Sequence, residues 1–128
     1  MRRVLYRLPD LLARPGETVF VVEGEKDADR LHAAGRLATT NPGGAGKWRD
    51  EYSALLRDRE VVILPDNDTP GRDHAVQVAR SLRGVAASIR VIELPGLPQK
   101  GDVSNWLSAG HTLDELDVLV AAATAHAP

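Results

Sequence analysis

The 128-residue sequence contains no cysteine, which excludes disulfide bonds, thiolate zinc sites and cysteine nucleophiles. Aromatic residues make up only 4% of the chain, too few for a sheet face that stacks several nucleic-acid bases. No apolar run approaches the roughly 20 residues of a membrane-spanning helix, and the first residues lack the apolar stretch of a signal peptide. We therefore expect no membrane association and a cytoplasmic location.

Neither sign of charge dominates the sequence. The 16 Lys and Arg residues against 18 Asp and Glu residues give a net charge of −2. This balance excludes a strongly basic protein that binds nucleic acid through bulk charge, so any such contact must be local or assisted by metal ions. The length and the 43% hydrophobic content are typical of one globular domain. We expect a single domain over 1–128, with its core at 17–108 and a helical C-terminal segment at 103–123.

Short apolar runs rich in β-branched residues alternate with segments of helical periodicity. The runs at 18–22 and 60–64 show no polar alternation, as expected for strands buried on both faces of a parallel sheet. Weaker runs at 36–40 and 87–94 are two further strand candidates. The alternation predicts an α/β fold with a mainly parallel central sheet of about four strands and helices on both faces.

Acidic residues follow three of the predicted strands. Glu23 ends the first run, Asp66 and Asp68 end the run at 60–64, and Asp102 follows the run at 87–94 after a Pro- and Gly-rich loop. In an extended chain, side chains at i and i+2 point to one side, so Asp66 and Asp68 should reach the same cation. Because ligands bind beyond the carboxyl ends of parallel strands, this pattern predicts a magnesium site in one crevice.

Helix capping is the alternative explanation for Asp102, and a helix-surface position is the alternative for Asp27. For Glu23, Asp66 and Asp68 a cation is the more economical explanation, since clustered carboxylates repel one another unless they are neutralised.

Two other motifs fit the sequence poorly. Phosphatases of the haloacid dehalogenase type carry Thr or Val two positions after the second Asp, where this chain has Pro70. The segment 42–48 is rich in glycine and contains Gly46-Lys47, but Trp48 stands where a Walker A loop needs Ser or Thr. The glycines of this segment let backbone amides approach a phosphate closely, or form a flexible turn.

Taken together, these motifs resemble the TOPRIM domain, which is shared by DnaG-type primases, type IA and type II topoisomerases and several nucleases. The resemblance covers about residues 18–107. The segments 21–31, 42–44 and 100–107 are most similar to primases and primase-helicases of phages, plasmids and bacteria. The resemblance implies a Rossmann-like TOPRIM fold.

It also implies the site residues. Glu23, Asp66 and Asp68 would be the catalytic acids and principal metal ligands, and Asp27 and Asp102 the outer ligands, for Mg²⁺ or Mn²⁺. In a primase the ions would bind the incoming triphosphate, lower the pKa of the attacking 3′-hydroxyl and stabilise the leaving pyrophosphate. Glu23 would serve either as a ligand or as a general base.

The implied function is RNA primer synthesis in DNA replication, with nucleoside triphosphates, a single-stranded DNA template and a replicative helicase as partners. Two alternatives stay open. A metal-dependent nuclease would use the same site to activate water, and a non-catalytic module would only bind nucleic acid or a replication partner.

Four basic residues near the motifs are candidates for phosphate or nucleic-acid contacts: Lys26, Lys47, Arg72 and Lys100. Lys47 is the best of them because of the neighbouring glycines, while solvated surface positions are the alternative for all four.

The sequence departs from a complete DnaG-type primase. It has no cysteine for a zinc module and no strongly basic segment, so we expect a part of a larger primase-helicase or a small stand-alone TOPRIM protein. It also has Asn105 where related primases often carry a second acid. The amide oxygen of Asn105 would coordinate without charge, or the side chain would cap or brace the loop.

Overall fold

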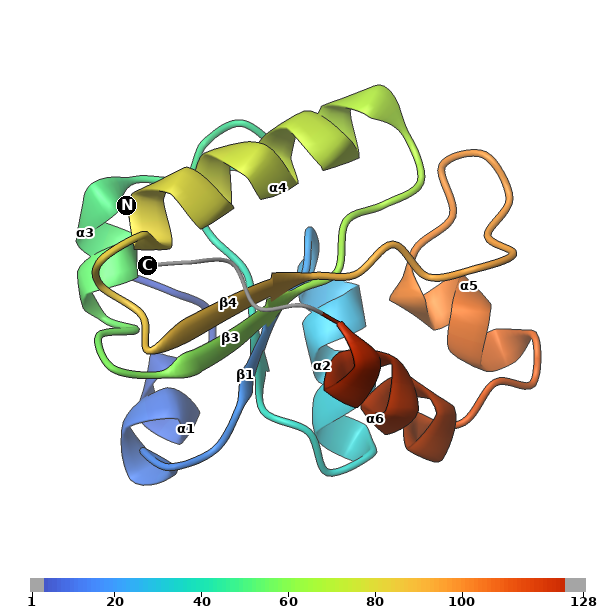
Figure 1. Ribbon diagram of the computed structural model, residues 1–128, viewed down its shortest axis with the longest axis horizontal. Helices are drawn as coiled ribbons and strands as arrows, with labels where there is room; N and C mark the ends of the chain where they lie inside the picture. The colour runs from blue at the N-terminus through green and yellow to red at the C-terminus, as the bar shows by residue number, and fades with distance from the viewer. Residues whose placement is uncertain (1–3, 124–128) are drawn as a thin grey trace.

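The computed structural model describes residues 4–123, and the two ends of the expected 1–128 domain, 1–3 and 124–128, lie outside the described residues. Strands and helices alternate along the described chain (Figure 1). In chain order the elements are α1 (Leu8–Ala13), β1 (Val19–Val21), α2 (Glu25–Ala33), β2 (Ala38–Thr39), α3 (Asp50–Ala54), β3 (Glu60–Ile63), α4 (Thr69–Leu82), β4 (Ser88–Val91), α5 (Val103–Ser108) and α6 (Leu113–Ala122).

The four strands form one parallel sheet in the order β2-β1-β3-β4. Each of the four predicted strands is present, although each is shorter than its apolar run. β1 and β3 occupy the centre of the sheet, with Phe20 opposite Val62. Since all strands run the same way, their carboxyl ends meet at one edge of the sheet.

Alternate residues of the central strands enter two separate apolar cores, which is why their sequences show no polar alternation. Val19 and Val21 belong to the core that contains residues of α1, α3 and α4. Phe20 and Val22 belong to the core that contains residues of α2, α5 and α6. The helices therefore cover both faces, and the predicted α/β architecture is confirmed (Figure 1).

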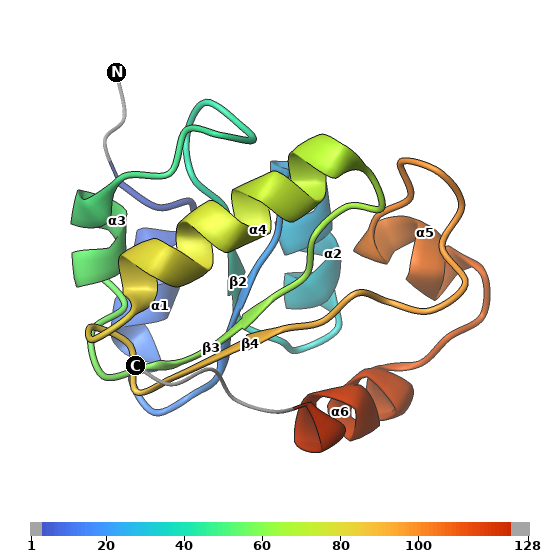
Figure 2. The ribbon, with the colours of Figure 1, turned by 45° about the horizontal axis from the view of Figure 1, so that its top comes forward.

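Helix α4 is the longest helix of the described residues and lies along β3 and β4 (Figure 2). Asp68 caps its first turn and Pro70 stands at the start, where the missing N–H costs nothing. Ala75, Val78 and Leu82 form its buried stripe at helical spacing. This packing fixes the start of α4 beside the carboxyl end of β3.

Within residues 4–123, every helix is too short or too polar to cross a membrane.

Candidate metal centre

Glu23 and Asp66 meet where the two central strands end. The backbone N–H of Asp66 donates a hydrogen bond to Oε2 of Glu23 at 2.6 Å. β1 and β3 are neighbours in the sheet, so the residues that follow them emerge side by side. Glu23 is half-buried and keeps one carboxylate oxygen outside this contact.

Three carboxylates converge at this edge of the sheet. Asp27, Asp66 and Asp102 each place an oxygen within 4.8 Å of the oxygens of the other two. Asp27 is only 4% exposed, while Asp66 and Asp102 are partly exposed. We call these three residues the acidic cluster.

Asp27 lies in the first turn of α2, which carries its side chain inward. Its Oδ1 accepts a hydrogen bond of 2.5 Å from the hydroxyl of Ser104 on α5. A buried carboxylate requires such a donor. Ser104 therefore ties α2 to α5 directly at the cluster, a contact that the sequence analysis missed.

Asp102 is brought to the cluster by Asn67, the residue between the two aspartates that follow β3. The Asn67 side chain donates to the carbonyls of Leu97 and Pro98 at 2.9 and 3.1 Å. Its backbone N–H donates to the carbonyl of Gly101 at 2.8 Å. These bonds fix the loop between β4 and α5 against the end of β3.

Asp102 and Asn105 form a reciprocal capping box at the start of α5. Each backbone N–H donates to the other side chain at 2.9 Å. The capping alternatives for both residues are therefore confirmed. The second carboxylate oxygen of Asp102 still faces Lys26, with an Oδ2 to Nζ distance of 3.5 Å.

Asp68 is not among the three acids whose oxygens lie within 4.8 Å of one another. The prediction assumed an extended chain, but β3 ends at Ile63, and a hydrogen bond from Asp68 N–H to the Asp66 carbonyl turns the backbone. The Asp68 side chain instead caps α4 by accepting from the N–H of Gly71 at 2.6 Å. The three acids with oxygens within 4.8 Å of one another are therefore Asp66 and the two expected outer ligands, Asp27 and Asp102.

Gly71 lets Glu23 and Asp68 approach the same point. A Cβ on Gly71 would lie 2.6 Å from Oε2 of Glu23 and 2.8 Å from Oδ1 of Asp68. Any side chain would therefore clash at this position. The absence of one leaves room for both carboxylates beside the acidic cluster.

The crowded carboxylates oppose one another's ionisation. Burial, with a further contribution from Glu23, raises the pKa of Asp66 to about 7. Burial also raises the pKa of Glu23, against the opposing hydrogen bond from Asp66 N–H. Burial raises the pKa of Asp27, although the Ser104 hydroxyl counteracts it. A hard divalent cation with oxygen ligands would neutralise this set of donors, so the residues present fit Mg²⁺ or Mn²⁺.

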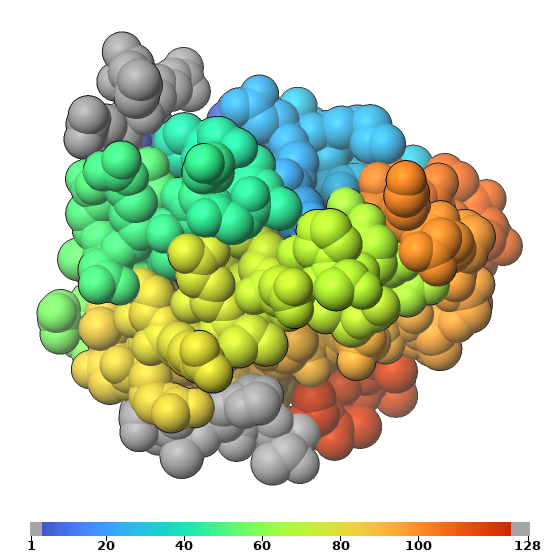
Figure 3. Space-filling model, turned by 90° about the horizontal axis from the view of Figure 1, so that it is seen from above, coloured from blue at the N-terminus to red at the C-terminus, as the bar shows by residue number. Residues whose placement is uncertain are grey.

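The four predicted basic residues differ in their surroundings. Lys26 is 75% exposed and pairs with Asp102. Arg72 donates to Oδ1 of Asn67 at 3.2 Å, beside the cluster. Lys47 and Lys100 are exposed on two loops, one after β2 and one after β4. Figure 3 shows these loops with the starts of α2 and α4 on one face of the molecule.

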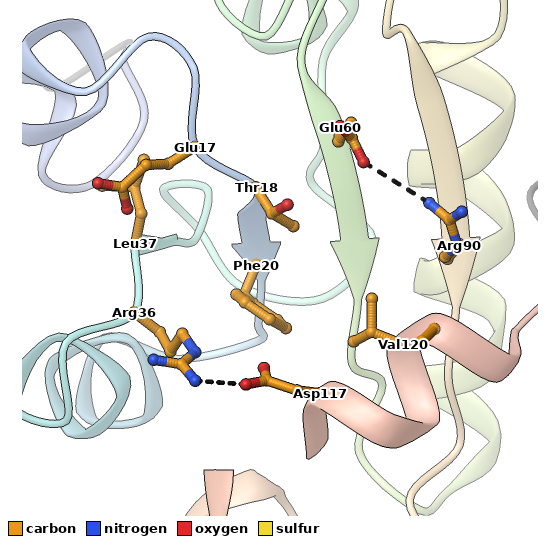
Figure 4. A pocket seen from close by; sticks show the side chains of 10 residues that line it. Glu17, Thr18, Phe20, Arg36, Leu37, Glu60, Arg90, Asp117 and Val120 are labelled. Atoms are coloured by element: carbon orange, nitrogen blue, oxygen red, sulfur yellow. Dashed lines mark hydrogen bonds and ion pairs between the residues drawn. The ribbon is translucent and has the colours of Figure 1, made fainter. Parts of the chain in front are cut away.

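The opposite edge of the sheet carries a second cavity, of about 420 Å³, between the amino ends of the strands and α6 (Figure 4). Four of its charged side chains pair with one another, and a fifth, Glu17, pairs with Arg14. Arg36 contacts Asp117 at 2.6 Å, and Arg90 lies 4.0 Å from Glu60. Because these ion pairs neutralise their charges, the cavity is a poorer candidate for a charged ligand than the acidic cluster is.

Two solved primase structures share the fold of this chain. The Aquifex aeolicus primase, solved as its zinc binding and RNA polymerase domains, has a TM-score of 0.73 and 22% identity, covering 95% of this chain and 30% of its own. The DnaG catalytic core has a TM-score of 0.73 and 21% identity, covering 94% of this chain and 40% of its own. The fold is therefore the one found in DnaG-type primase cores, in agreement with the predicted TOPRIM domain.

Two phage proteins extend the comparison. A structure of bacteriophage T7 lagging-strand DNA polymerase with primase domains, an RNA/DNA hybrid and dTTP matches with a TM-score of 0.56 and 20% identity, over 78% of this chain and 53% of that one. The "Gene 57 protein" of Mycobacterium phage D29 is 34% identical over 85 residues, or 66% of this chain and 53% of that protein. The chain spans about half the length of this relative. No protein-family profile matches the present sequence.

Proposed function

We propose that this chain is the metal-binding domain of a primase, in which Mg²⁺ or Mn²⁺ supports nucleotidyl transfer during RNA primer synthesis. The observation that carries the proposal is the acidic cluster at the carboxyl edge of the sheet, where burial and neighbouring charge raise the pKa of Asp66 to about 7. A group so strongly perturbed in an acidic crevice is a candidate functional residue. The primase structures that share the fold support the choice of reaction.

Within this proposal, Asp27, Asp66 and Asp102 bind the cation, and Glu23 and Asp68 complete the acidic crevice around it. The bound ion would supply charge neutralisation and lower the pKa of an attacking hydroxyl. Glu23 holds the end of β3 in place by accepting the hydrogen bond from the Asp66 N–H. Lys26, paired with Asp102 in the absence of a ligand, would move to a phosphate oxygen of a bound nucleotide.

A groove beside the crevice supports nucleic acid as a partner. It has a volume of about 430 Å³ and runs between α4 and the edge strand β4. Arg72, Arg80 and Arg83 line it together with the apolar side chains of Val76 and Val91. Glu93 also lines it, 4.0 Å from Arg72, so two of the three arginines have no acidic partner among the described residues of the groove. Such a combination suits a single strand, which exposes both its phosphates and its bases. Local charge of this kind is what a chain with a net charge of −2 requires.

Primer synthesis, a helicase partnership and an RNA product are proposals for the longer protein that such a domain would serve. The primase chains that share the fold are two to three times longer than this one, as the 30% and 40% coverage shows.

Calorimetric titration of Mn²⁺ tests the proposal directly. The wild-type chain should bind Mn²⁺, and a nucleoside triphosphate should tighten the binding. The double substitution Asp66→Asn and Asp68→Asn should abolish it. Asp58→Asn with Asp114→Asn is the matched control, because both acids are exposed and lie outside the cluster. Binding that survives in the first double variant would contradict the proposed site.

The activity of the loaded protein separates the reaction classes. Template-dependent synthesis of oligoribonucleotides supports a primase, and cleavage of a DNA strand by the same acids would identify a nuclease instead.

A further inference from the structure

The glycine-rich loop after β2 has a defined shape. Gly43, Gly44 and Gly46 have φ values of 87°, 82° and 80°, in the left-handed region that favours glycine. The side chain of Asn41 donates to the carbonyls of Pro42 and Gly44, both at 2.9 Å. The N–H of Lys47 donates to the carbonyl of Gly44 at 3.3 Å, which closes the turn. Backbone amides that precede this bond can face an anion in such a turn.

Helix α4 holds the far side of this loop. The N–H of Gly46 donates to Nδ1 of His74 at 2.9 Å. The side chain of Gln77 donates to the carbonyl of Trp48 at 3.5 Å. His74 and Gln77 are three residues apart and share one helix face. The backbone on both sides of Lys47 is therefore attached to α4.

The same helix carries Asp68 at its N-terminus. His74 follows Asp68 by six positions, which corresponds to about 9 Å along a helix. The loop and Asp68 are thus attached to the same helix. A displacement of α4 would move the loop and Asp68 together.

Stability alone does not explain a histidine at this position. His74 is 3% exposed, and burial lowers its pKa, so the ring is neutral at pH 7. Because Nδ1 accepts a hydrogen bond, the ring proton is on Nε2, which is buried and has no partner among the described residues. An unpaired buried donor destabilises the folded state. Gly46 is exposed, so water could replace the ring as the acceptor for its N–H.

We propose that His74 is a positioning residue, which holds the loop of residues 43–47 as a phosphate-binding loop on the face that also carries the start of α4. Lys47 and the loop amides would bind the phosphates of a nucleoside triphosphate. The choice of a triphosphate rests on the proposed function, whereas the anion site stands on the loop geometry.

The test measures the affinity for inorganic tripolyphosphate in metal-free buffer, with wild type, His74→Leu and His74→Asn. His74→Leu removes the acceptor but keeps an apolar side chain, so the affinity should fall by about threefold to tenfold. The Oδ1 of Asn can occupy nearly the same place as Nδ1, so His74→Asn should restore most of the affinity. The melting temperature of His74→Leu should stay unchanged or rise. Equal affinity in wild type and His74→Leu, or no binding by wild type, would overturn the proposal.

A double-mutant cycle with Lys47→Met separates positioning from general damage. If His74 acts through the loop, the effect of His74→Leu should largely disappear when Lys47 is already replaced. The amide hydrogens of Gly46 and Lys47 should also exchange faster in His74→Leu. The same fold loss in both backgrounds would assign His74 a purely structural role and overturn the proposal.

The outcome of the tripolyphosphate test does not depend on whether the acidic cluster binds a metal ion. Mn²⁺ affinity should be equal in wild type and His74→Leu, because the acidic cluster does not contact His74. A wild type that binds tripolyphosphate but no Mn²⁺ would refute the proposed metal function and leave the anion loop standing.

Discussion

At the scale of single residues, the site combines groups that would repel one another in isolation. Asp27 is buried with one neutral donor, and Asp66 is partly buried beside Glu23. In the folded protein without a cation, burial therefore raises the pKa of both acids. The balance depends on pH and on metal, and both dependences can be measured.

Asp66 should make the metal-free protein less stable as the pH rises from 4 to 7. Its pKa is 3.8 in an unfolded chain and about 7 in the folded protein. Across this window the unfolded state releases the proton while the folded state retains it, so the free energy of unfolding falls with rising pH. Below pH 4 both states are protonated and the difference vanishes.

The substitution Asp66→Asn should remove the part of the fall in unfolding free energy between pH 4 and 7 that Asp66 causes. With a chelator present, the variant should be more stable than wild type at pH 7.5, by about 1–2 kcal/mol after allowance for solvent screening. Urea unfolding at several pH values measures the effect, and Asp58→Asn serves as the control. A variant that is less stable than wild type at pH 7.5 would show that the carboxylate supports the fold.

Gly71 should tolerate no side chain, although it is neither buried in an apolar core nor in a left-handed conformation. In Gly71→Ala the Cβ would meet the carbonyl of Asp66 and a Glu23 oxygen, both at 2.6 Å. We expect a loss of about 1–3 kcal/mol in stability, as for other overpacked sites, together with weakened Mn²⁺ binding.

Gly24→Ala is the matched control for this substitution. Gly24 also follows a strand and precedes a helix, but a Cβ there would have no atom within 4 Å. It should bind Mn²⁺ as wild type does. Equal behaviour of the two variants would contradict the crowded geometry at Gly71.

At the scale of elements, the sequence predicts the architecture well because it depends on patterns that extend over several residues. The apolar runs correctly predict all four strands, and segments of helical periodicity between them correspond to helices. The convergence of Glu23, Asp66 and Asp102 follows from parallel strands that end at one edge. These inferences need no knowledge of individual contacts.

The details of the site depend on single long-range contacts, which no local pattern contains. One backbone hydrogen bond turns the chain between Asp66 and Asp68, and another from the N–H of Gly71 makes Asp68 the cap of α4. The contact of Ser104 with Asp27 spans 77 residues. For the position of Asp102, the sequence did offer one signal. Asn67 stands between the two aspartates, and an amide side chain can bind two backbone groups at once.

The loop between β4 and α5 should loosen when Asn67 is replaced. Asn67→Ala removes the two side-chain bonds to the Leu97 and Pro98 carbonyls and the bond accepted from Arg72, but keeps the backbone bonds. The stability should fall by about 1 kcal/mol, and Mn²⁺ affinity by about threefold to tenfold, because Asp102 is held less firmly.

Thr112→Ala provides the comparison for this element. It removes the cap of α6 at a cost of about 1 kcal/mol, without a contact to the cluster. Calorimetry should show unchanged Mn²⁺ affinity in this variant. A loss equal to that of Asn67→Ala would mean that both act through global stability.

At the scale of the whole molecule, the fold separates two edges of one sheet. The carboxyl edge collects the five acids, and all of them come from residues 23–102 of this chain. The amino edge holds the cavity whose charged residues are already in ion pairs. The domain should therefore bind a divalent cation by itself, whatever further domains the reaction requires.

The most direct test of this claim is to map bound Mn²⁺ on the protein by NMR. The paramagnetic ion broadens the amide signals of nearby residues, so the affected residues reveal where it binds. We predict selective broadening at 23–27, 66–71 and 101–104, with the α6 signals unchanged and the effect absent in Asp66→Asn with Asp68→Asn. Uniform broadening, or broadening centred on the amino edge of the sheet, would contradict a metal site at the acidic cluster.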